Sequence, residues 1–179
     1  MSENGKEINI LNFLDGPAQP PLPPSKKMVD FGLDILTHSS IGIELYEFVR
    51  DNNVKIRIIQ GPEERSYAAS KDEVVIILRA ANPANPSRFI LLLTGAIREL
   101  MQEHEGMELP PPSRNEEHVL EQMRIKDADK ITYMCGVAYE INEISGFHNY
   151  HIIDELENMG YSKDWKSFKD ALYQYKDRR

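Results

Sequence analysis

The spacing of the apolar residues changes twice between residues 28 and 141, and this change restricts the fold more than any other feature of the chain. Apolar residues recur at helical spacing over 28–52, over 87–106 and again from about residue 115. Between the first two helical segments, residues 54–58 alternate apolar with polar, and residues 74–78 form a continuous apolar run, as in strands. Strands that do not alternate with helices predict an α+β fold, with a small antiparallel or mixed sheet packed on helices.

Capping and turn residues set the expected ends of several elements. Thr37–Ser40 interrupts the first helical segment and predicts two helices or one broken helix. Two short C-terminal helices are expected over 152–159, ended by Gly160, and over 165–175. Two apolar stripes are expected to face each other across adjacent helices. They are Ile90, Leu93, Ile97 and Leu100 on one helix, and Ile131, Met134, Ala138 and Ile141 on the other.

The N-terminal segment contains five prolines between Pro17 and Pro24, which exclude a helix or a central strand there. We therefore predict a Pro-rich N-terminal arm over 1–27 and a single domain over 28–179. Residues 21–26 also fit the PxxPxK pattern that aromatic-lined grooves bind, so the arm is a candidate interaction segment as well as a tether.

Composition narrows the classes of function. The 179 residues carry a formal net charge of −8, which disfavours binding to a phosphate backbone, so no nucleic acid partner is expected. The first residues lack a basic stretch followed by an apolar one, and no apolar run is long enough for a membrane span. A single cysteine, Cys135, excludes a disulfide framework within the chain and, amid apolar neighbours, suits a core thiol. These features predict a cytoplasmic protein without a membrane partner.

Two short motifs contain the candidate catalytic and binding residues. The second helical segment contains Arg98-Glu99-Leu100-Met101-Gln102, and Asp127-Ala128-Asp129 follows near the start of the third. Zinc peptidases place two histidines four residues apart on one helix face, with a glutamate beside the first that activates water. Taken alone, Glu99 equally suits a solvated helix face, and the two aspartates suit favourable positions near a helix start.

The order of the strand over 74–78, the Asn-Pro loop and the helix LLLTGAIRELMQEHEG resembles a bacterial family of zincin-like metallopeptidases of unknown function. Members carry His-Glu-Leu-Arg-His on this helix and a Glu-Ala-Asp-Ala-like motif on the next, which supplies the third zinc ligand. The resemblance extends over about 33–144 and implies a zincin-like core.

Within this family pattern, Glu99 has the general-base position, Arg98 and Gln102 have the positions of the two histidines, and Asp127 has that of the third ligand. A guanidinium offers no lone pair to a metal, and glutamine is a weak zinc ligand. No metal or other cofactor is therefore expected. Arg98, Asp127 and Asp129 are the expected binding residues of this degenerate site, with Arg98 paired with Asp127 or, failing that, with Asp129.

These observations favour a catalytically inactive metallopeptidase-like domain, a pseudoenzyme that binds a peptide or protein. One alternative is a metallopeptidase with non-standard metal ligands, in which zinc would be the cofactor. Another is an interaction module that acts through the Pro-rich arm.

Overall fold

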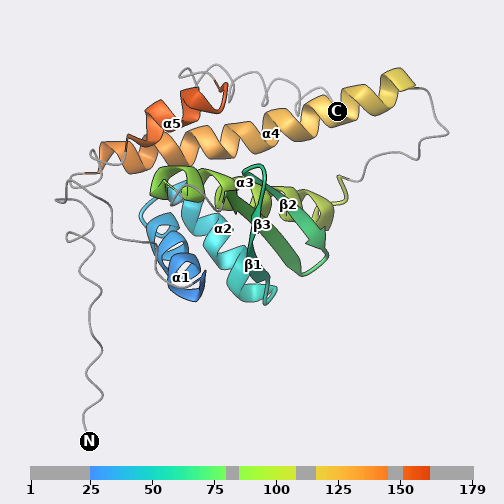
Figure 1. Cartoon of the computed structure of the whole chain (residues 1–179). Helices are drawn as coiled ribbons and strands as arrows, with labels where there is room; N and C mark the ends of the chain where they lie inside the picture. Colours follow the sequence, from blue (N-terminus) through green and yellow to red (C-terminus); the bar gives the residue numbers. More distant parts are fainter. Residues whose placement is uncertain (1–24, 80–84, 108–115, 145–150, 162–179) are drawn as a thin grey trace, which may run out of the picture.

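A computed structural model describes residues 25–79, 85–107, 116–144 and 151–161, which form five helices and one three-stranded sheet (Figure 1). The helices are α1 (Ser25–Leu36), α2 (Ser40–Asp51), α3 (Pro86–His104), α4 (Glu116–Glu143) and α5 (Ile152–Asn158). The strands are β1 (Lys55–Gly61), β2 (Arg65–Ser70) and β3 (Glu73–Arg79). The predicted α+β class with a small sheet packed on helices is confirmed.

The sheet is mixed, with the strand order β1-β3-β2. The central strand β3 runs parallel to β1 and antiparallel to β2, with Val75 aligned with Arg57 on one side and Tyr67 on the other. Residues 74–78 are buried, as the continuous apolar run predicts. The edge strand β2 was not predicted, because its inward residues are the small Ser66 and Ala68, which give no apolar alternation.

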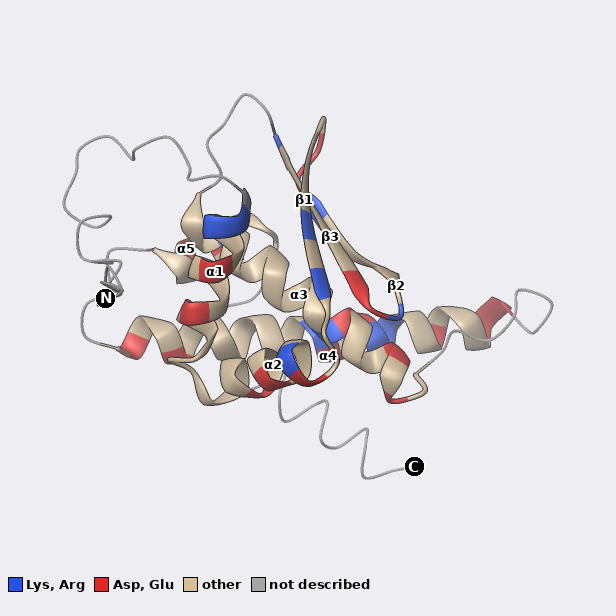
Figure 2. Cartoon of the chain, turned by 90° about the horizontal axis from the view of Figure 1, so that it is seen from below, with Lys and Arg blue, Asp and Glu red and all other residues tan. Residues whose placement is uncertain are grey.

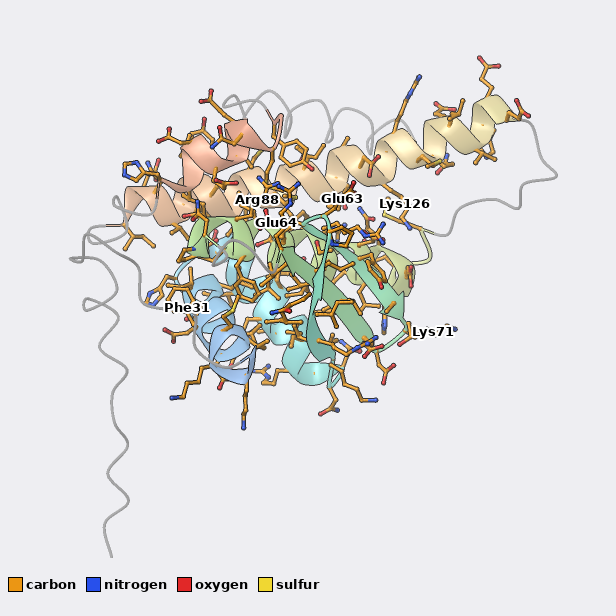
Figure 3. All side chains as sticks on the ribbon, viewed as in Figure 1. Phe31, Glu63, Glu64, Lys71, Arg88 and Lys126 are labelled. Carbon is orange, nitrogen blue, oxygen red and sulfur yellow. The ribbon has the colours of Figure 1, made fainter. Side chains whose placement is uncertain are left out.

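Helix α3 lies between the sheet and α4 and is buried along most of its length (Figure 1). Asn85 caps its N-terminus by accepting a hydrogen bond from Ser87 N, with Pro86 in the first turn. Arg88, at the same end, forms ion pairs with Glu64 before β2 (3.1 Å) and Glu155 of α5 (2.7 Å). Figure 3 shows Arg88 and Glu64 side by side at this junction.

The break between α1 and α2 lies where the capping residues predicted it. Ser39 is the N-cap of α2, and its hydroxyl accepts from Gly42 N at 2.9 Å. The Glu140 carboxylate of α4 accepts hydrogen bonds from the hydroxyls of Ser39 (2.6 Å) and Ser40 (2.7 Å) and from the backbone N of Ile41 (3.2 Å). Helix α4 therefore stabilises the start of α2 with a partly buried anion.

Helices α3 and α4 are neighbours, as predicted, but the predicted contact face of α3 needs correction. Gly95 faces α4, because a Cβ at this position would lie 3.2 Å from Met134 Sδ. Leu93 lies on another side, against α1, where a Cβ at Gly32 would be 2.7 Å from Leu93 Cδ2. All eight residues of the two predicted stripes belong to or pack on the same core. Because α3 is buried on nearly every side, its apolar stripe does not identify the face toward α4.

Some expectations lie outside the described residues. Residues 1–24 and 165–175 are among these, so the fold of the proline segment and of the last expected helix is not described here. The described chain begins with α1 at Ser25, so residues 25–27 belong to a helix instead of the predicted arm. Gly160 has a positive φ of 85° after α5, as expected of a glycine that follows a helix C-terminus. Among the described helices, none combines the length and the apolar character that a membrane crossing requires.

Candidate functional site

The two motifs meet across the gap between α3 and α4. Arg98 and Gln102 are four residues apart, so both side chains leave α3 on the face toward α4. Arg98 Nε donates to Asp129 Oδ2 at 2.5 Å, and Gln102 Nε2 donates to the same oxygen at 2.9 Å. Arg98 and Gln102 thus converge on one carboxylate oxygen of α4.

Arg98 is a buried cation with two anionic partners and an aromatic one. Its side chain is 1% exposed, and that of Asp129 is fully buried. The two terminal nitrogens bind the Glu105 carboxylate in bidentate geometry, at 2.7 and 3.0 Å. The guanidinium carbon lies 4.3 Å from the centre of the Tyr133 ring. Burial by itself lowers the pKa of Arg98, but its hydrogen bonds to Glu105 and Asp129 outweigh burial and raise the pKa above its usual range.

Asp127 does not pair with Arg98, so the preferred pairing is wrong and the second choice, Asp129, is the observed one. The Asp127 side chain is 61% exposed and forms an ion pair with Lys130 at 3.3 Å. Residues two apart on a helix differ by about 200° in direction, so only one of the two aspartates can face α3. The aspartate that faces α3 is Asp129, which shares the buried stripe of α4 with Ile125 and Thr132.

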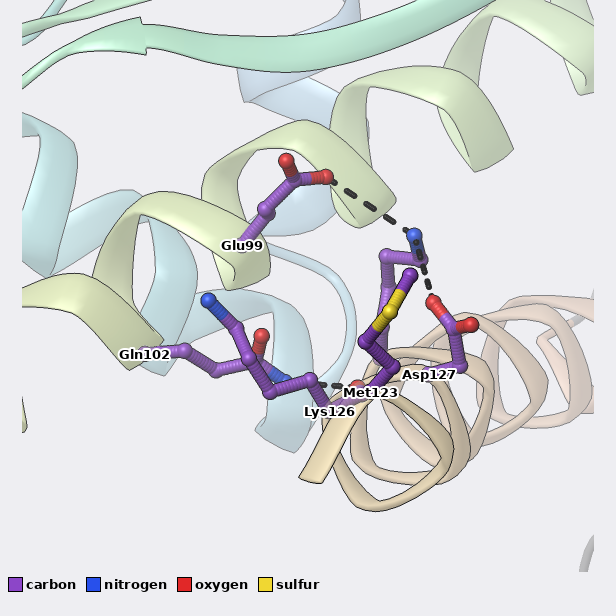
Figure 4. A pocket seen from close by; sticks show the side chains of 6 residues that line it. Glu99, Gln102, Met123, Lys126 and Asp127 are labelled. Carbon is purple, nitrogen blue, oxygen red and sulfur yellow. Dashed lines mark hydrogen bonds and ion pairs between the residues drawn. The ribbon is translucent and has the colours of Figure 1, made fainter. Parts of the chain in front are cut away.

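Glu99 points away from the buried pair, toward a shallow pocket. The pocket has a volume of about 170 Å³ and lies between α3 and α4 (Figure 4). Lys130 lies between Glu99 (3.7 Å) and Asp127 (3.3 Å), as the dashed lines of Figure 4 show. The residues that line the pocket are Glu99, Gln102, Met123, Lys126, Asp127 and Lys130. The general-base position is therefore next to an ammonium group on the open side of the gap.

Two partners of the buried pair, Glu105 and Tyr133, were missed at the sequence level. Glu105 is seven residues from Arg98, which places both on one face of α3 two turns apart. Tyr133 is one turn beyond Asp129, and its hydroxyl donates to Glu44 of α2 at 3.0 Å. Burial is the main cause that raises the pKa of Tyr133 above its usual range, so the phenol is neutral and donates. Polar residues at spacings of four and seven on α3 and of four on α4 are the signal that would have indicated this network.

The residues of the gap do not fit a zinc ion. Arg98 carries a fixed positive charge into the space between the helices, where it would repel a divalent cation. Gln102 presents its NH₂ group to Asp129 and to the carbonyl oxygen of Lys126 at 2.8 Å, which leaves the amide directed as a donor. In the described part of the chain, no three side chains of His, Cys, Asp or Glu are grouped so that they could hold a metal. Cys135 is buried, and burial raises the pKa of its thiol to about 11, as suits a core residue.

Comparisons with known proteins give no match to this chain among protein-family models, curated proteins or solved structures.

Proposed function

We propose that this chain is a non-catalytic domain on a metallopeptidase-like scaffold, in which the Arg98 guanidinium replaces the metal ion, and that the domain binds a peptide or protein. One observation carries the proposal: Arg98 and Gln102, at the positions of the two motif histidines, converge on Asp129 Oδ2. A carboxylate buried to this degree requires a positive partner, and an arginine tethered to α3 supplies one without a metal.

The electrostatics of the gap support a role in stability and not in catalysis. The single charge of Arg98 faces two carboxylates, Asp129 inside the protein and Glu105 near the surface. Activation of a water requires a base and an electrophile that both contact it. Glu99 is the remaining candidate base, but it lies beside Lys130 on the pocket side, whereas Arg98 binds its carboxylates on the buried side.

The alternative of a peptidase with non-standard ligands would require Arg98 to leave the gap. That movement would break three hydrogen bonds to carboxylates and leave Asp129 buried without its cation. The alternative of a module that acts through the Pro-rich arm concerns residues 1–27, of which 1–24 lie outside the described residues.

Elemental analysis of the protein purified without chelators tests the non-catalytic proposal. We expect well under one zinc per chain, and no hydrolysis of casein or of a quenched peptide library after incubation with zinc. Stoichiometric zinc that is lost in Asp129→Asn but kept in Asp127→Asn would overturn the proposal and favour the metallopeptidase. The Asp127 variant is the matched control, because it removes one carboxylate of α4 on the exposed side.

A further inference from the structure

The outer face of the sheet carries most of the basic residues of the strands. Side chains alternate along a strand, so the residues aligned with Val75 and Ile77 point away from α3. The core against α3 includes Val74, Ile76 and Leu78 but neither Val75 nor Ile77, which agrees with this alternation. The basic residues of the outer face are Lys55, Arg57, Arg65 and Arg79.

Among the described helices, α3 packs on the inner face and α1 contacts β1 (Figure 1). On the outer face the basic side chains are exposed, whereas Val75 and Ile77 of the central strand are buried. Figure 2 shows blue residues along β1 and at the end of β3. Tyr67 is 36% exposed beside Arg65, whose guanidinium lies 5.9 Å from the ring centre. The face thus combines cations with an accessible aromatic ring.

The acidic groups near this face neutralise only part of its charge. Lys55 pairs with Asp72 at 3.0 Å and Arg57 with Glu73 at 3.1 Å, but both basic side chains remain more than half exposed. Exposed pairs of this kind contribute little and exchange readily for another carboxylate. Glu63 and Glu64 lie in the turn before β2, and Glu64 is paired with Arg88 at 3.1 Å.

We propose that the outer sheet face is the docking surface for an extended acidic segment of a partner protein. The whole chain has a net charge of −8, so an acidic ligand needs a local group of cations such as the one on this face. Lys55 and Arg57 are two residues apart on one strand, so they repeat at about 7 Å, the spacing of alternate side chains in an extended peptide. A long polyanion such as a nucleic acid would extend past this small face onto acidic surface.

This inference deepens the proposed function, because it names the surface and the partner class of the protein-binding role. Its probe is a fluorescein-labelled oligoglutamate peptide, titrated with the full chain in low salt and followed by anisotropy. The test variant is Arg65→Gln with Arg79→Gln, two exposed residues of the face. The matched control is Arg50→Gln with Arg124→Gln, which removes the same charge from α2 and α4.

We expect saturable binding that weakens with salt. The sheet variant should raise Kd about two- to thirty-fold, from two exposed charge contacts, and the control less than about two-fold. No binding to oligoglutamate, or equal losses in both variants, would overturn the docking surface. Tighter binding to an oligothymidylate strand than to the peptide would overturn the choice of a protein partner. None of these outcomes bears on zinc content, so failure here is distinct from failure of the non-catalytic proposal.

Discussion

Substitution of Arg98 by methionine tests how the buried anion is stabilised. Arg98→Met keeps much of the side-chain volume but removes the cation that binds Asp129, which is fully buried. An unpaired buried charge costs about 3–5 kcal/mol. The free energy of unfolding of a typical domain is about 5–15 kcal/mol, so this loss would be a large fraction of the stability.

Urea unfolding followed by circular dichroism measures this loss. With a denaturant slope of about 2 kcal/mol/M, the midpoint should fall by about 1.5–2.5 M. Adding Asp129→Asn removes the stranded charge, so the double variant should be more stable than the sum of the two single losses predicts, by about 0.5–3 kcal/mol. Asp127→Asn is the control and should change stability by less than about 0.5 kcal/mol, because its carboxylate is exposed.

Additive losses, or an equal coupling of Arg98 with Asp127, would refute this reasoning. Additivity would mean that Arg98 and Asp129 do not depend on each other. Coupling with Asp127 would mean that α4 is rotated relative to the structure described here.

Three further predictions concern the surrounding core. Gly42→Ala should cost about 1–3 kcal/mol in urea unfolding, because the added Cβ would lie 2.2 Å from the carbonyl oxygen of Leu36. Cys135 should react with iodoacetamide at pH 8 only after unfolding, since burial raises the pKa of its thiol to about 11; rapid labelling of the native protein would contradict this. Burial raises the pKa of Glu140, but hydrogen bonds from Ser39, Ser40 and the backbone outweigh it, so the folded pKa is lowered. Glu140→Gln should therefore cost about 1 kcal/mol at neutral pH, and the difference from wild type should shrink as the pH falls from the usual glutamate pKa through the lower pKa of the folded state, where the wild-type carboxylate becomes protonated.

The sequence predicted elements well where one pattern dominates. The continuous run over 74–78 identified a buried strand, and the capping residues of Thr37–Ser40 identified the break before α2. The sequence did not predict elements whose buried residues are small or polar and are covered by neighbouring helices. Strand β2 places Ser66 and Ala68 toward α3, and Ser66 is held by a hydrogen bond to the Leu92 carbonyl at 2.7 Å. Small residues of this kind leave no periodic signal.

The candidate site was predicted in its parts but not in its geometry. Arg98 was expected in the gap, and the structure places it there together with Gln102. The choice between Asp127 and Asp129 depends on the rotation of α4, which a motif alignment alone does not fix. The buried stripe through Ile125, Asp129 and Thr132 contained that information, since apolar spacing on α4 continues through Asp129.

Zinc binding to the double variant Arg98→His, Gln102→His tests the central claim most directly. If Arg98 stands where a metal ion would, two imidazoles four residues apart opposite Asp129 provide three ligands for zinc. Calorimetric titration of the variant, with its fold checked by circular dichroism, should show one zinc per chain, and adding Asp129→Asn should weaken that binding at least about tenfold. A folded double variant that binds no zinc, or whose zinc binding is unaffected by Asp129→Asn, would contradict the account.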